Sequence, residues 1–225
     1  MAFVIRETRT DHPVMPMHMF RSRNFSAANV IGLTFTLGMM GSVFLLSQYL
    51  QIVQGYSPLQ AGLRTLPWTA APMVVAPIAG VLAPRTGLRP LLAIGLVLQT
   101  ASLIWFAALT ENAAAYPSFV TPLLMAGVGM GLTFAPMATA VLEGLPERDF
   151  AMASSANSTI REFGVALGIA LLTAVFLGND GALDPQGYDG AIGPALLTGA
   201  VAVGIAMVAS LFVGGRSRRA GAPAQ

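Results

Sequence analysis

Six long stretches of apolar residues alternate with short polar connectors along this chain of 225 residues. Each stretch holds about 20 mostly apolar residues, the length an α-helix needs to cross roughly 30 Å of hydrocarbon. The stretches cover residues 29–50, 59–83, 91–109, 119–142, 155–177 and 191–213. The pattern therefore predicts six membrane-spanning helices.

The connectors are rich in residues that end helices. They read QGYSP, PRTGLRP, TENAAAYPS, EGLPERDFA and GNDGALDPQGYDG. Proline lacks an amide donor and glycine loosens the backbone, so such clusters separate helices. None is long enough for a further domain. We expect an all-α membrane protein with a leader over residues 1–28, a six-helix transmembrane bundle over 29–213, and a tail over 214–225.

Composition supports a membrane protein over a soluble one. The chain is 55% hydrophobic and only 10% charged, whereas soluble domains carry about 25% charged residues. The net charge is only +2 and the sequence forms no basic face, so nucleic acid is not an expected partner. The absence of cysteine excludes disulfides and thiolate metal sites. We expect no metal and no cofactor.

The arginines indicate how the bundle is oriented. Ten of the twelve basic residues, all of them arginine, fall on one side of a six-span chain. They are Arg6, Arg9, Arg21, Arg23, Arg85, Arg89, Arg148, Arg216, Arg218 and Arg219. The opposite connectors carry Glu111, Asp180, Asp184 and Asp189. Because arginine marks the cytoplasmic side, we expect a multi-pass protein of the cell (inner) membrane with both termini in the cytoplasm.

One connector carries a recognisable pattern within GVLAPRTGLRP, residues 80–90. It resembles the loop signature of the major facilitator superfamily, which recurs between the second and third helix of each six-helix half. The matching positions are Gly80, Leu82, Arg85, Gly87 and Arg89. The family form usually has an acidic residue shortly after the leucine, where Ala83 and Pro84 stand here. A weakened signature of this kind is typical of the second half.

Three further stretches narrow the resemblance. They are PMHMFRSRNF at 16–25, GYSPLQAGLRTLP at 55–67 and SSANSTIREFGVALGIAL at 154–171. Together with the loop they resemble the C-terminal half of the fourteen-span drug–proton antiporters. The resemblance implies half of the major facilitator fold, built as a 3+3 inverted repeat. It also implies that Gly80, Arg85, Gly87 and Arg89 form a gating loop at the helix ends.

The implied function is export of lipophilic drugs or related small molecules by alternating access. The proton gradient supplies the energy, so the implied partners are the lipid bilayer, a lipophilic substrate and protons. Family members carry an N-terminal half with most of the proton-coupling residues. We therefore expect this chain to be a fragment or half-transporter that needs the missing N-terminal half.

Polar residues inside apolar stretches are candidate sites, because polar groups are costly in hydrocarbon. Asn157 and Arg161 share a helical face. One interpretation places both on a central cavity near its cytoplasmic mouth. The other is an arginine that reaches toward the membrane surface and pairs with a neighbouring helix.

A second candidate stripe lies in the first span. Thr34, Gly38, Gly41 and Gln48 could face a cavity, with Thr34 and Gln48 offering hydrogen bonds to a substrate. The predicted substrate pathway is thus Thr34, Gln48, Asn157 and Arg161. Arg64, near the outer end of the second span, is interpreted as reaching the outer headgroups or as a gating contact.

Other residues have structural interpretations. Pro67, Pro72 and Pro77 are expected to bend the second span. The glycines of the fourth and fifth spans, Gly127, Gly129, Gly131, Gly164 and Gly168, are expected to let helix backbones approach closely.

Two other function classes compete with transport. A non-transporting membrane scaffold or assembly subunit remains the alternative. An intramembrane enzyme is disfavoured, because the chain has no HExxH motif, no aspartyl pair at mid-membrane and no Ser/His pair within the spans. We expect no catalytic residues.

Overall fold

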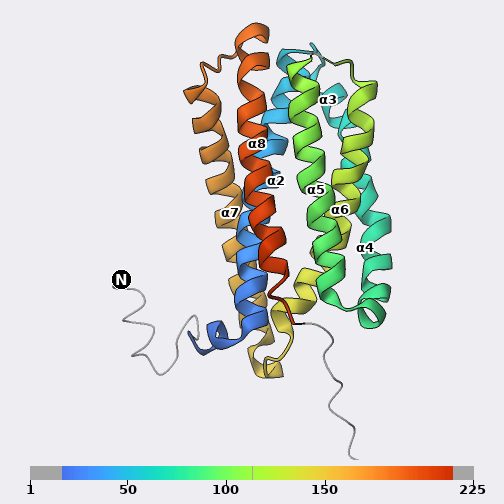
Figure 1. Ribbon diagram of the computed structural model, residues 1–225, viewed down its shortest axis with the longest axis vertical. Coiled ribbons are helices and arrows are strands. Elements are labelled where there is room, and N and C mark those ends of the chain that lie inside the picture. The colour runs from blue at the N-terminus through green and yellow to red at the C-terminus, as the bar shows by residue number, and fades with distance from the viewer. Residues whose placement is uncertain (1–16, 113, 215–225) are drawn as a thin grey trace, which may run out of the picture.

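Six long helices form the protein in the computed structural model, which describes residues 17–112 and 114–214 (Figure 1). The elements are η1 (Met17–Arg21), α2 (Arg23–Ile52), α3 (Pro58–Arg64), α4 (Leu66–Thr86), α5 (Leu88–Glu111), α6 (Pro117–Leu142), η2 (Glu147–Asp149), α7 (Phe150–Gly178) and α8 (Pro185–Ser210). Six helical segments are long and apolar enough to cross a membrane. The prediction of six spans in an all-α fold is confirmed.

Several helices begin earlier than the hydrophobic pattern predicts, because polar caps extend them. Ser22 caps α2, where its hydroxyl accepts a hydrogen bond from the Phe25 amide at 3.4 Å. Asp184 caps α8 by accepting hydrogen bonds from the amides of Gln186 (3.1 Å) and Gly187 (2.9 Å). Capping side chains accept hydrogen bonds from the free amides of a first turn. Polar residues that the pattern assigns to connectors are therefore part of the helices.

The second span is divided into α3 and α4 at Thr65. Pro67 stands in the first turn of α4, where its missing amide leaves no hydrogen bond unmade. Pro72, Pro77 and Pro84 instead lie inside α4. The chain therefore breaks before the first proline and stays helical through the other three.

The helices pack in the order α7, α2, α8, α5, α6, α4. Helix α2 packs against α7 and α8, α5 packs against α8 and α6, and α4 packs mainly on α6. Figure 1 shows α7 and α4 at opposite sides of the bundle. The five contacts between neighbours in this order are kept when α2 is exchanged with α6, α4 with α7 and α5 with α8. This is the contact pattern expected of a 3+3 repeat.

The two outer helices are the least buried. Only 11% of the most apolar window in the α3–α4 span is buried and 22% in the α7 span, against 44–56% in the other four. The inner helices approach one another through paired glycines. Gly38 of α2 lies against Gly199 of α8, and Gly95 of α5 lies against Gly129 of α6. A side chain at any of the four would meet the facing backbone.

The arginines gather at one end, as the connectors predict. The start of α2 and the α4–α5 and α6–α7 connections lie together at the lower end in Figure 1. Five described arginines lie there, at helix ends or in connectors: Arg21, Arg23, Arg85, Arg89 and Arg148. Residues 1–16 and 215–225, with Arg6, Arg9, Arg216, Arg218 and Arg219, lie outside the described residues, and so does most of the predicted leader and tail.

Candidate functional site

A buried amide pair joins α2 to α7. The Asn157 side chain is 6% exposed and donates a hydrogen bond from Nδ2 to Oδ1 of Asn29 at 3.1 Å. Asn29 in turn donates to the Phe25 carbonyl oxygen at 2.8 Å. Asn157 therefore lies inside a helix–helix contact, where its amide holds α7 against α2.

Arg161 lies one turn further along α7 and crosses the same contact. Gly32 of α2 makes room for it, because a Cβ there would come within 3.1 Å of the Arg161 Cγ and 3.3 Å of the Asn157 Nδ2. The Thr36 hydroxyl donates to the Arg161 carbonyl oxygen at 3.0 Å. The structure thus places Asn157 and Arg161, both on α7, against the same part of α2.

The Arg161 guanidinium has aromatic and hydroxyl neighbours. Its central carbon lies 5.3 Å from the centre of the Phe134 ring of α6, and Nη2 donates to the Ser158 hydroxyl at 3.4 Å. No carboxylate of the described residues lies within 4.0 Å of it, and its buried Nε has no hydrogen-bond acceptor. An ionised group inside a membrane is stabilised by partners or water. Arg161 therefore has unused capacity for an anionic or acceptor group.

Thr34 and Gln48 lie elsewhere on α2. Both are half-buried, and the Thr34 hydroxyl donates to the Val30 carbonyl of its own helix at 2.8 Å. The two residues are fourteen positions apart, about 21 Å along the helix. The glycines between them pack on neighbouring helices, Gly38 on α8 and Gly41 on Gly168 of α7. No hydrogen bond among the described residues joins Thr34 or Gln48 to Asn157 or Arg161.

The predicted gating loop is almost entirely helical. Residues 80–86 are the end of α4, and α5 begins at Leu88. Gly87 alone joins the two helices, with φ 90° and ψ 162° and its amide donating to the Ala83 carbonyl at 2.9 Å. This left-handed backbone suits a residue without Cβ. Gly87 therefore lets two long helices turn back on each other.

The loop borders a cleft of about 880 Å³ at the arginine-rich end of the bundle. Gly80, Pro84 and Gly87 line one side, and Glu143 and Phe150 belong to the other side, around the α6–α7 connection. Arg85 and Arg89 are exposed beside it. The α4–α5 loop thus lies across this cleft from the α6–α7 connection.

Arg64 lies between two tyrosines at the opposite end. Its guanidinium carbon is 3.6 Å from the centre of the Tyr56 ring and 5.1 Å from that of Tyr116. The Tyr116 hydroxyl donates to the Arg64 carbonyl oxygen at 3.0 Å. A cation over aromatic faces is a stabilising contact. Arg64 thus ties the α2–α3 connector to the α5–α6 connector.

No metal site is found among the described residues, where no three His, Cys, Asp or Glu side chains cluster.

Comparison with known proteins identifies the family. The model of the Major Facilitator Superfamily matches residues 4–169. The chain belongs to the Major Facilitator Superfamily. This is a family of transporters and not of enzymes, and membership places the chain in a membrane.

Curated members of the superfamily extend the match. The chain is 30% identical over 175 residues to the uncharacterized MFS-type transporter YhcA of Bacillus subtilis, covering 78% of this chain and 33% of that protein. It is 33% identical to the multidrug resistance protein B homolog of Mycobacterium tuberculosis, covering 74% and 31%. It is 28% identical to the multidrug export protein EmrB of Escherichia coli K12, covering 79% and 35%. The chain spans about a third of the length of these relatives.

A solved superfamily structure has the same fold. The crystal structure of a D-xylose–proton symporter matches with a TM-score of 0.62 and 21% identity, over 86% of this chain and 48% of that chain. At this identity the likeness shows the fold alone.

Four residues that contact Asn157 or Arg161 were not predicted from the sequence: Asn29, Gly32, Thr36 and Phe134. The first three recur at i, i+3 and i+7, the spacing of one helical face, so the polar face of α2 could have been found. Phe134 could not, because nothing in an apolar span marks a ring that will face a cation.

Proposed function

We propose that this chain is the C-terminal half of a proton-coupled transporter that exports lipophilic small molecules by alternating access. Two of the relatives named above are a multidrug export protein and a multidrug resistance protein homolog. The observation that carries the proposal is Arg161, a cation inside a membrane bundle of a transporter family with no carboxylate partner among the described residues. Such a group is a functional-site candidate by default.

Exposed surfaces on α7 and α4 support an assembly with a second half. On α7, Ala166, Ala170 and Ala174 recur every fourth residue and all are exposed. Small residues at this spacing let membrane helices pack closely. On α4, Met73 is 79% exposed and Val74 is 65% exposed. We propose that an N-terminal half covers these two helices.

In this proposal the two halves rock about a site between them. Arg161 provides a charge on one wall, and the buried Asn157 orients it by holding α7 to α2. Thr34 and Gln48 remain predicted pathway residues. Arg85 and Arg89, on the cytoplasmic side, bias the transporter between its open states, with Gly80 and Gly87 shaping the loop.

The test uses purified protein in liposomes with an imposed pH gradient and a fluorescent lipophilic cation. One sample is this chain alone. The other is this chain joined behind the part of E. coli EmrB that precedes the matched segment. We expect gradient-dependent dye movement only from the joined protein, abolished when a proton ionophore collapses the gradient.

Variants of the joined protein test the role of Arg161. Arg161→Gln should lower the rate at least about tenfold, equivalent to about 1.4 kcal/mol. Arg148→Gln, which removes an exposed arginine at η2, should leave the rate unchanged. Dye transport by this chain alone would contradict a half-transporter. An assembled joined protein that moves no dye would favour the scaffold alternative.

A further inference from the structure

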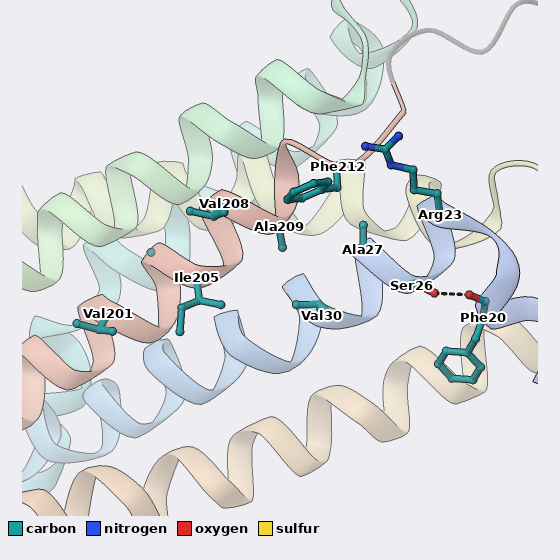
Figure 2. A pocket seen from close by; sticks show the side chains of 11 residues that line it. Phe20, Arg23, Ser26, Ala27, Val30, Val201, Ile205, Val208, Ala209 and Phe212 are labelled. Carbon is teal, nitrogen blue, oxygen red and sulfur yellow. Dashed lines mark hydrogen bonds between the residues drawn. The ribbon is translucent and has the colours of Figure 1, made fainter. Parts of the chain in front are cut away.

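A lateral groove of about 690 Å³ opens between the start of α2 and the end of α8 (Figure 2). Its walls are apolar except at one end. The lining includes Phe20, Ala27, Val30, Val201, Ile205, Val208 and Phe212, with Arg23 and Ser26 as the polar members. The Ser26 hydroxyl already donates to the Phe20 carbonyl oxygen at 2.7 Å.

The groove is about as long as one leaflet of a bilayer. On α8 it runs from Val201 to Ala209, about 12 Å along the axis, and Phe212 extends it past the helix end. Half of the roughly 30 Å hydrocarbon core is about 15 Å. Beyond Val201 the groove is closed by the contact of Gly199 with Gly38. It therefore ends near mid-membrane.

The open end of the groove is cationic. Arg23 is exposed, and its guanidinium carbon lies 5.6 Å from the centre of the Phe212 ring. No described carboxylate lies within 4.0 Å of it. Arg21, two residues earlier, is also exposed. Arginines at the end of a membrane-spanning helix lie at the level of the lipid headgroups.

We propose that this groove binds one anionic phospholipid, with its acyl chains between α2 and α8 and its phosphate at Arg23. A transmembrane helix would need a groove along the whole span, and this one covers a single leaflet. A free phosphate would leave the apolar walls unused. The inference rests on the membrane setting of the family and not on the proposed transport activity.

The first test counts lipids on the purified chain by native mass spectrometry. Phosphatidylglycerol and phosphatidylcholine with identical oleoyl chains are titrated in detergent. We expect about fivefold tighter binding of phosphatidylglycerol, because one basic residue near an anionic headgroup contributes about 1 kcal/mol. Arg23→Gln should remove this preference. Arg148→Gln, the same charge change away from the groove, should retain it.

A second variant tests the acyl chains. A Cβ on Gly204 meets no atom within 4 Å, so Gly204→Leu fills the groove without straining the fold. It should lower binding of both lipids. Gly190→Leu on the same helix, where a Cβ also meets nothing within 4 Å, is the matched control and should bind both normally.

The outcomes separate the possible occupants. Glycerol phosphate, a headgroup without chains, should fail to displace phosphatidylglycerol; displacement would mean that Arg23 binds a phosphate only. Equal binding of the two lipids by the unaltered chain, or binding that survives both Arg23→Gln and Gly204→Leu, would overturn the proposal. So would the absence of bound phospholipid.

Discussion

The α2–α7 contact and the α4–α6 contact occupy equivalent places in the 3+3 repeat of helices, yet they differ in chemistry. In the first, Gly164 and Gly168 bring α7 onto the backbone of α2, and the Asn29–Asn157 pair lies beside them. In the second, Gly127 of α6 lies against the Trp68 backbone and Gly131 faces the Val75 side chain, with no polar pair beside them among the described residues. Trp68, at the same contact, has a buried Nε1 without a hydrogen-bond partner.

The two contacts share their glycine packing but not their polar residues. Close approach of helices through glycine is common to both contacts, because membrane helices gain mainly from van der Waals packing. The polar cluster with Arg161 is present only in the first. A repeated arrangement of helices thus contains a polar cluster that is not repeated, because close packing and polar contacts depend on different residues.

The largest effect is expected where backbone faces backbone. A side chain on Gly168 would collide with the Leu37 carbonyl, so Gly168→Val should force α7 away from α2 and destabilise the bundle by about 3 kcal/mol or more. Gly131→Val should cost less, about 1–3 kcal/mol, because its Cβ would lie 2.7 Å from the Val75 Cβ and 3.2 Å from the Ala76 amide nitrogen, a milder overlap that a small shift of the outer helix α4 relieves.

Unfolding in detergent with increasing dodecyl sulfate measures both variants. Gly190→Val, in open space, is the control and should unfold like the unaltered chain. Equal loss from Gly168→Val and Gly131→Val would mean that the two contacts are equivalent after all.

A moderate effect is expected from the amide pair. Asn157→Leu should destabilise the bundle by about 1 kcal/mol, because hydrogen bonds between membrane helices average about 0.6 kcal/mol and reach about 1.7. Asn29→Leu should cost a similar amount. If the hydrogen bond carries the effect, the double variant loses less than the sum of the two; strict additivity in the same unfolding assay would argue against it.

The smallest effect is expected at Gln99, in the α5–α6 contact. Its Nε2 donates to the Thr133 hydroxyl at 3.0 Å, but its buried Oε1 has no partner. The equivalent position in the α2–α8 contact is Val203, four residues after Gly199 as Gln99 is after Gly95. Gln99→Leu loses the hydrogen bonds from Nε2 to the Thr133 hydroxyl (3.0 Å) and the Gly95 carbonyl oxygen (3.4 Å). It also removes one unsatisfied acceptor, so stability should change by less than about 0.5 kcal/mol. A loss above 1 kcal/mol would show that Gln99 is needed where Val203 suffices.

Local features were predictable from the sequence. Six apolar stretches and their breakers determined the number of helices, because span length and hydropathy are properties of contiguous residues. Five glycines of α6 and α7 are also predictable as packing residues, because small residues let membrane helices approach closely. In the structure a neighbouring helix lies against each of them: Gly127, Gly129, Gly131, Gly164 and Gly168. Helix limits were less predictable. The caps at Ser22 and Asp184 and the helical course through Pro84 depend on backbone hydrogen bonds that hydropathy does not register.

The sequence by itself determined that this chain has six segments long and apolar enough to cross a membrane, and its loop signature indicated the transporter superfamily. Only the tertiary structure decided that Asn157 bonds to Asn29, 128 residues away, and that Arg161 faces Phe134. It also decided that α2 and α8 separate into a groove near Arg23. These contacts depend on the order and rotation of packed helices. In a chain that is apolar on nearly every face, no periodic pattern encodes that rotation.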